Sequence, residues 1–240
     1  MMCKNKSKQT MKYLTELKPI DPCVLICYDA MCQLKEDSRF ISALETNKNI
    51  LEDEDELTKI YERNYIISLA YKVGQRNVCY EDFNCLVNGE ILKIIDTDKN
   101  IIDTWKKLKD PSPNIIDHLQ CYPDFVFHES NNPNSTISEY QHLILEAKTS
   151  KNLSSKDFCK DFFKLNLYIE KLNFRSAVYL LINTQKSTVE KFINEYIKEY
   201  GFISTANGKI YFLIQENLKS DIKLYSFDKE IKVEANLNKK

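Results

Sequence analysis

Apolar residues recur with a helical period over residues 154–173. Spacings of three and four place them on one face of a helix, which would bury that face against the rest of the protein. The stripe consists of Phe158, Phe162, Leu165, Ile169 and Leu172. Ser154 or Ser155 stands where a side-chain oxygen can cap the first turn. The segment therefore predicts an amphipathic helix.

A second helix is predicted over residues 51–74. Its first turn is acidic from Glu52 to Glu56, and negative charge stabilises the positive amino end of a helix. Apolar residues follow at helical spacing, namely Leu57, Ile60, Tyr61, Tyr65, Ile66, Leu69 and Val73. Gly74 is expected to end the helix as a cap.

Short apolar runs between polar turns predict the strands. Residues 78–87 favour a strand, and so does the segment CYPDFVFHE at 121–129. The segment YQHLILEAK at 140–148 is expected to pair with 121–129 as a hairpin, across the polar residues 130–138. Residues 89–113 match neither the helical nor the strand pattern alone.

The carboxyl-terminal half continues the alternation of strands and helices. An apolar strand (SAVYLLINT) precedes a helix predicted over residues 188–200, which Gly201 would close. Another strand follows the Asn207–Gly208 turn. This order of elements argues for an α/β fold with a central mixed sheet and helices on both faces.

We place this domain at residues 51–216. Residues 1–50 are expected to form an N-terminal extension, partly disordered or built as a small helical addition. Residues 217–240 are expected to be a tail, in which the segment IKLYSF can supply an edge strand.

The composition is that of a globular protein: 43% of the 240 residues are hydrophobic and 29% are charged, which excludes a disordered chain. No apolar run approaches the roughly 18 residues that a membrane-spanning helix needs, so we expect no membrane partner. The lysine-rich N-terminus lacks the apolar stretch of a secretory signal, which favours a cytoplasmic protein.

A net charge of -1 excludes nucleic-acid binding through a field over the whole surface, so such binding would need a local patch. The charges are segregated along the chain. Residues 45–62 hold seven acidic residues against two lysines, and residues 148–175 hold seven basic residues against three acidic ones. Two solvated helix faces would give the same pattern.

Candidate chemistry lies in the predicted hairpin. Glu146 and Lys148 share one face of their strand because side chains at i and i+2 point the same way. With Asp124 they would bring three ionisable groups together in an apolar sheet, where such groups bind metal or pair with each other. Two carboxylates suit Mg²⁺ or Mn²⁺, and a lysine can orient or deprotonate a water and offset charge on a phosphate. The plainer alternative is a strand-end aspartate beside a surface Glu–Lys pair.

The P-D pair, followed in the next apolar strand by E-A-K, resembles the PD-(D/E)xK nuclease superfamily, whose core is the restriction-endonuclease-like fold. The order of elements from about residue 51 to 184 is similar to that of the family. The resemblance implies that Asp124 and Glu146 bind the metal together with the carbonyl of Ala147, and that Lys148 assists the attacking water.

The resemblance also implies a glutamate from the first core helix. Glu62 is the natural match, because it precedes Tyr65, Ile66 and Leu69 by three, four and seven positions and so lies on the inward face. Glu56 and Glu81 are its competitors.

Asp161, Lys164 and Tyr168 form a polar stripe beside the apolar face of the helix at 154–173. The resemblance implies that Lys164 contacts the scissile phosphate and that Tyr168 packs or stacks nearby. Lys151 would extend the basic character toward a phosphate backbone. A solvated helix face is the alternative for this stripe.

The sequence thus leads to the hypothesis of a Mg²⁺- or Mn²⁺-dependent nuclease that hydrolyses phosphodiester bonds, in DNA rather than RNA. The first alternative is a catalytically silent nucleic-acid-binding or scaffolding module of the same fold. Dimers are common among restriction-type enzymes, so a homodimer stays open. The second alternative is a zinc protein built on some of the eight cysteines, although no C-x-x-C pair occurs.

Overall fold

The computed structural model describes ten stretches of the chain, and every structural statement below concerns them. They are residues 14–16, 21–37, 54–77, 86–89, 91–108, 118–129, 136–137, 139–204, 209–217 and 220–228. In the helix at 54–77, the side chains are described for residues 62–75.

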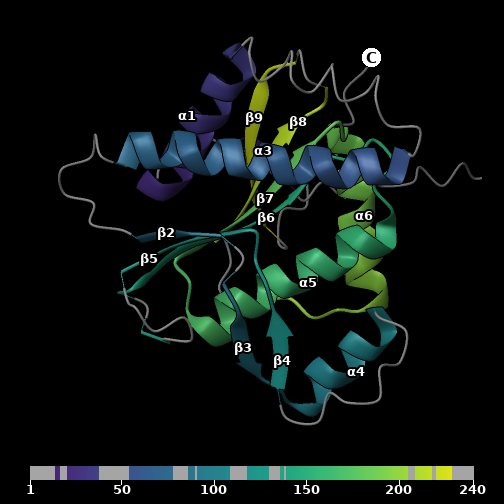
Figure 1. The fold of residues 1–240 in the computed structure, drawn as a ribbon. Coiled ribbons are helices and arrows are strands. Elements are labelled where there is room, and N and C mark those ends of the chain that lie inside the picture. The colour runs from purple at the N-terminus through teal and green to yellow at the C-terminus, as the bar shows by residue number, and fades with distance from the viewer. Residues whose placement is uncertain are drawn as a thin grey trace, which may run out of the picture.

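Seven of the described strands form one central sheet in the order β1-β9-β8-β7-β6-β5-β2 (Figure 1). Strands β6, β7 and β8 run parallel to one another and the remaining pairs are antiparallel, so the sheet is mixed, as predicted. The strands are β1 (Leu14–Glu16), β2 (Leu86–Asn88), β5 (Phe125–His128), β6 (Gln141–Lys148), β7 (Ser176–Ile182), β8 (Ile210–Gln215) and β9 (Ile222–Phe227).

Helices cover both faces of this sheet. Helices α1 (Pro22–Glu36) and α3 (Glu54–Asn77) lie on one face, and α5 (Ser155–Leu172) and α6 (Lys186–Glu199) lie on the other (Figure 1). Each face has its own apolar core. The predicted α/β class is therefore confirmed. None of the described helices combines the length and apolar character that crossing a membrane requires.

Successive side chains of β6 pack alternately into these two cores. Ile144 packs in the core beneath α5, whereas Leu143, Leu145 and Ala147 pack in the core that contains α1 and α3. Because both faces of β6 are covered, nearly the whole strand is buried. Glu146 follows the parity of Ile144, so it points toward α5.

Helix α5 forms where its periodicity predicts. Ser154 caps it, since its hydroxyl oxygen accepts a hydrogen bond from the Asp157 N–H at 3.1 Å. Helix α6 also matches its expected position and is followed by Gly201 at a φ of 68°, which is left-handed backbone that favours glycine. In contrast, Gly74 does not end α3, which continues to Asn77; the predicted cap is wrong.

The chain between β2 and β5 carries a separate two-stranded ribbon made of β3 (Lys93–Asp96) and β4 (His118–Cys121). Helix α4 (Lys99–Leu108) connects these strands along the chain, and ribbon and helix project to one side of the main sheet (Figure 1). The undecided segment 89–113 therefore contains both a strand and a whole helix.

The predicted continuous strand at 121–129 is wrong, because β4 ends at Cys121 and β5 begins at Phe125. Pro123 lies in the break and has no N–H to donate to a ladder. The consequence is that Asp124 stands in a bend at the start of β5 rather than inside a strand. The predicted hairpin of β5 with β6 is confirmed. Of the strand expected at 78–87, residues 78–85 lie outside the described residues.

The expected boundaries at residues 50 and 216 do not separate packing units. Strand β1 and helix α1 belong to the main sheet and its core, although both lie in the expected N-terminal extension. Strand β9, in the expected tail, pairs with both β8 and β1 and is therefore not an edge strand. Residues 1–13, 17–20, 38–50, 218–219 and 229–240 of these two segments lie outside the described residues.

Candidate active site

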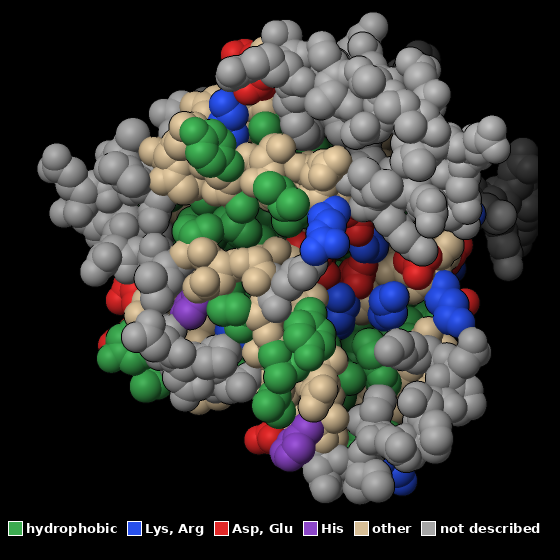
Figure 2. All heavy atoms as spheres, viewed as in Figure 1, with side chains coloured by type: hydrophobic (Ala, Val, Ile, Leu, Met, Phe, Trp, Pro, Cys, Tyr) green, Lys and Arg blue, Asp and Glu red, His purple; other side chains and the backbone are tan. Residues whose placement is uncertain are grey.

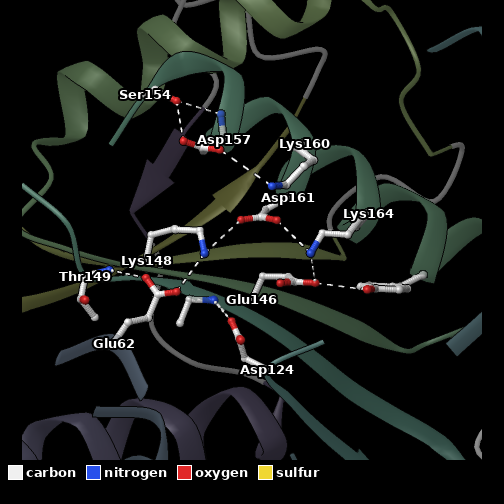
Figure 3. A network of polar contacts seen from close by, with 12 residues as sticks. Glu62, Asp124, Glu146, Lys148, Thr149, Ser154, Asp157, Lys160, Asp161 and Lys164 are labelled. Atoms are coloured by element: carbon white, nitrogen blue, oxygen red, sulfur yellow. Dashed lines mark hydrogen bonds and ion pairs between the residues drawn. The ribbon is translucent and has the colours of Figure 1, made fainter. Parts of the chain in front are cut away.

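Asp124 meets strand β6 at the end that carries Glu146 and Lys148. Strands β5 and β6 are antiparallel, with Phe125 opposite Leu145, so the start of β5 lies beside the end of β6. The Asp124 carboxylate accepts a hydrogen bond from the Ala147 N–H at 2.8 Å (Figure 3). The structure thus brings the predicted aspartate onto the predicted E-A-K strand.

Glu62 reaches the same place from α3. Its Oε1 accepts from the Lys148 ammonium at 3.0 Å and its Oε2 accepts from the Thr149 N–H at 3.3 Å (Figure 3). Both carboxylate oxygens are therefore fixed by the end of β6. The side chains of Glu62 and Lys148 are 24% and 23% exposed, so this pair borders solvent. Two other glutamates were considered for this position. Glu81 lies outside the described residues, and only the backbone of Glu56 is described.

Glu146 is held from the opposite side by α5. The Lys164 ammonium lies 2.7 Å from Glu146 Oε1, and the Tyr168 hydroxyl donates to the same oxygen at 3.1 Å. Lys164 and Tyr168 are one turn apart on α5, which explains why both reach one carboxylate. Tyr168 is fully buried, so in this position it supports Glu146.

Asp161 joins the two lysines and was given no role by the sequence. One carboxylate oxygen lies 2.8 Å from Lys164 Nζ and the other lies 3.5 Å from Lys148 Nζ (Figure 3). The side chain is almost fully buried. Its spacing of three from Lys164 was visible in the sequence, but its contact with Lys148 depends on how α5 lies over β6.

Lys151 does not enter this network. It is exposed in the turn between β6 and α5. Its expected contact with a phosphate backbone stays a prediction, as do the expected substrate contacts of Lys164 and Tyr168.

The network contains more negative than positive groups. Four carboxylates, on Glu62, Asp124, Glu146 and Asp161, share two ammonium groups, on Lys148 and Lys164. Fully ionised, the cluster would carry a formal surplus of two negative charges (four minus two). In Figure 2 acidic side chains lie near the middle of this surface, with Lys and Arg side chains above, below and to the right of them.

Burial raises the pKa values of two of these carboxylates. It raises the pKa of Asp124 to about 6, although the Ala147 N–H and Lys148 oppose the rise. It also raises the pKa of Glu146 to about 8, where Lys164 opposes the rise and the charges of Asp161 and Asp124 add to it.

Burial and the neighbouring carboxylates act in opposite directions on the pKa values of the two lysines. Burial by itself lowers the pKa of Lys148, but Asp161, Glu62 and Asp124 together raise it above its ordinary value. The pKa of Lys164 is also raised, since Glu146 and Asp161 outweigh the effect of burial. Lys148 is thus a fixed cation at neutral pH, able to orient a water or stabilise an anion but not to abstract a proton.

The groups of the cluster suit a hard divalent cation, because its carboxylates offer oxygen ligands and outnumber the ammonium groups that neutralise them. In an extended strand the N–H and C=O of one residue point to the same side, so the Ala147 carbonyl is directed toward Asp124, as its N–H is. Within the described ranges, however, no group of three or more His, Cys, Asp or Glu side chains is arranged to hold a metal ion. Three of the four carboxylates instead pair with the two lysine ammonium groups, and Asp124 accepts from the Ala147 N–H.

The cysteines show no zinc site within the part of the chain that is described. Cys121 and Cys159 are buried in the core beneath α5, as expected for small apolar side chains. Cys23 and Cys27 are buried in α1.

Comparisons of the chain with protein-family models, with curated proteins and with solved structures each found no match. What the site can do is therefore inferred from its own geometry and electrostatics.

Proposed function

We propose that this protein is a divalent-metal-dependent nuclease of the PD-(D/E)xK type, which hydrolyses phosphodiester bonds in DNA. The observation that carries the proposal is the convergence of Asp124, Glu146 and Lys148 at one end of β6, in a cluster with surplus negative charge. Burial raises the pKa of Glu146 to about 8, and binding of a cation would displace this proton.

The residues that would hold the cation are Asp124, Glu146, Glu62 and the Ala147 carbonyl. A bound Mg²⁺ or Mn²⁺ would polarise the phosphoryl oxygen and lower the pKa of a coordinated water. Lys148, kept protonated by its carboxylates, orients the attacking water and offsets charge that develops on the phosphate. Lys164 fixes the Glu146 carboxylate and keeps it from turning away.

The alternative of a silent nucleic-acid-binding module explains this cluster less well. Burying charged groups is unfavourable by several kcal/mol per ion before their pairing is counted. A module that needs only a binding surface has no requirement for four acidic groups at the end of a buried strand. The two functions differ in one measurable property: only the nuclease requires the cluster to bind a divalent ion.

The test is cleavage of plasmid and oligonucleotide DNA in Mg²⁺ or Mn²⁺, with calorimetric titration of Mn²⁺ alongside. Asp124→Asn and Lys148→Met are each expected to lower the cleavage rate by roughly 100-fold or more while the domain stays folded. Lys191→Ala is the matched control, since this lysine is 70% exposed on α6 and pairs with Glu195.

Unchanged cleavage by purified Lys148→Met would rule out the assignment. DNA binding by the wild type without Mn²⁺ binding or cleavage would favour the silent module.

A further inference from the structure

Tyr122 is an exposed aromatic residue beside the cluster. It lies two residues before Asp124, in the break between β4 and β5, and is 56% exposed. Tyr71 and Tyr140 are exposed as well, but Tyr122 differs from them because it stands two residues from Asp124, a member of the cluster.

The direction of the Tyr122 side chain follows from the β3–β4 ribbon. Along β4 exposure alternates: His118 and Gln120 are exposed, whereas Leu119 and Cys121 are buried in the core beneath α5. Tyr122 continues the exposed set. The residue before a proline favours extended backbone, which preserves this alternation up to Pro123. The outer face of the ribbon therefore leads through Tyr122 to Asp124.

The distance that the backbone spans from Tyr122 to Asp124 is similar to the size of one nucleotide. Two extended residues span about 7 Å. This is comparable with the separation between a phosphate group and its own base. A phosphate at Asp124 would consequently have a neighbouring base beside the Tyr122 ring.

The chemistry of the ribbon's outer face favours stacking over binding a phosphate backbone. Among the described residues of β3 and β4, no Lys or Arg is exposed; Lys93 is fully buried. The exposed His118 is paired with Asp96 at 3.1 Å. In Figure 2 hydrophobic side chains lie beside the acidic centre on this face, while the Lys and Arg side chains border the centre elsewhere. A second strand of a duplex would find no exposed basic side chain on the ribbon itself.

We propose that Tyr122 stacks on the base of a nucleotide adjoining the scissile phosphate, and that the substrate is single-stranded at that nucleotide. This inference rests on the proposed nuclease function. Inside a continuous duplex each base is covered on both faces by its neighbours, so an aromatic side chain can stack only on an unpaired, terminal or displaced base. The class of substrate is therefore single strands, flaps or overhangs.

The test compares kcat/KM on three substrates of one sequence: a single strand, a continuous duplex and a duplex with a single-stranded end. Tyr122→Ala is expected to lower the value for the single strand and the overhang by about 5- to 150-fold, from the usual contribution of one base–aromatic stack. Tyr122→Phe keeps the ring and is expected to retain activity. Tyr140→Ala is the control, since Tyr140 is 38% exposed but precedes β6 at the end opposite Lys148.

The inference is overturned if the wild type cleaves the continuous duplex faster than the single strand, or if Tyr122→Ala loses no more than Tyr140→Ala. Either outcome leaves the nuclease proposal intact. If no substrate is cleaved, the nuclease proposal fails, and binding of a fluorescent single-stranded oligonucleotide to the metal-free protein decides about Tyr122. Weaker binding by Tyr122→Ala alone then supports stacking, and equal binding by both alanine variants contradicts it.

Discussion

The carboxylate of Asp161 lies 2.8 Å from the ammonium of Lys164, one turn farther along α5. Its other oxygen lies 3.5 Å from Lys148, so a single buried carboxylate fixes the relative positions of both lysines. Burial alone would raise the pKa of Asp161, but Lys164 and Lys148 outweigh it and hold the pKa below its usual value. Asp161 is thus a positioning residue for the cluster that is charged at neutral pH.

Replacing Asp161 tests this positioning role. Asp161→Asn keeps the shape of the side chain but removes the charge shared by the two lysines. We expect a loss of about 1–3 kcal/mol in the free energy of unfolding, as for a hydrogen bond to a charged group, and a lower cleavage rate with little change in KM. Urea unfolding and steady-state kinetics measure these two effects.

Asp221→Asn provides the comparison, since it removes an equally short ion pair, to Lys35, from a site where Asp221 is 89% exposed. The free energy of unfolding of Asp221→Asn is expected to lie within about 0.5 kcal/mol of the wild-type value. Equal stabilities of the two variants would contradict a structural role for Asp161.

The raised pKa of Asp124 predicts how the stability of the metal-free protein depends on pH. Its pKa rises from 3.8 to about 6 on folding, so the folded state binds this proton more tightly than the unfolded state. The resulting stabilisation is fully present below about pH 4 and is lost as the pH rises through about 6. Asp124→Asn carries no such proton.

The stability of Asp124→Asn relative to wild type should therefore increase between pH 4 and pH 7, by roughly 1–3 kcal/mol. Denaturant unfolding of both proteins in the presence of a metal chelator measures this difference. A difference that stays constant over this range would show that Asp124 titrates normally. Saturating Mn²⁺ should reverse the order at pH 7, because only the wild type gains from binding the ion.

Local pattern was sufficient to predict the elements that build the site. Helix α5 shows its apolar stripe from Phe158 to Leu172, and the alternation in β6 correctly placed Glu146 on one face and Ala147 on the other. The predictions for α5 and β6 succeeded because each depends on residues close together in the chain. The choice of Glu62 depended on the resemblance as well as on its position relative to the apolar residues of α3.

Elements that depend on distant partners were missed. Strand β1 is three residues long and pairs with β9, with Leu14 opposite Phe227, so no local pattern marks it as part of the sheet. The four-residue strands β3 and β4 are too short to establish a period. The role of Asp161 was missed for a related reason, because the rotation of α5 over β6 is a tertiary property.

Two fully buried tyrosines allow a matched test of the support for Glu146. The Tyr168 hydroxyl donates to Glu146, whereas the Tyr179 hydroxyl has no hydrogen-bond partner within the part of the chain that the structure describes. Tyr168→Phe should lower the free energy of unfolding by about 1–2 kcal/mol, and Tyr179→Phe should leave it unchanged or raise it. Thermal unfolding of the two variants measures the contrast, and the opposite ranking would contradict the bond to Glu146.

Replacing the central cation should change metal binding and catalysis in opposite directions. In Lys148→Met the apolar stem is retained, but Glu62, Asp124 and Asp161 lose a shared counterion. The formal surplus of negative charge grows from two to three, so Mn²⁺ should bind more tightly, by roughly tenfold or more, since tenfold is expected for one charge about 6 Å from a divalent ion even at the dielectric of bulk water. Cleavage should nevertheless be lost, because the ammonium group that orients the water, that of Lys148, is absent. Calorimetric titration and a cleavage assay on the same preparation measure both effects, with Lys191→Met on α6 as the control. Unchanged Mn²⁺ affinity in Lys148→Met would mean that the ion binds elsewhere, whereas tighter binding with normal cleavage would remove Lys148 from the chemistry and leave the carboxylates in place.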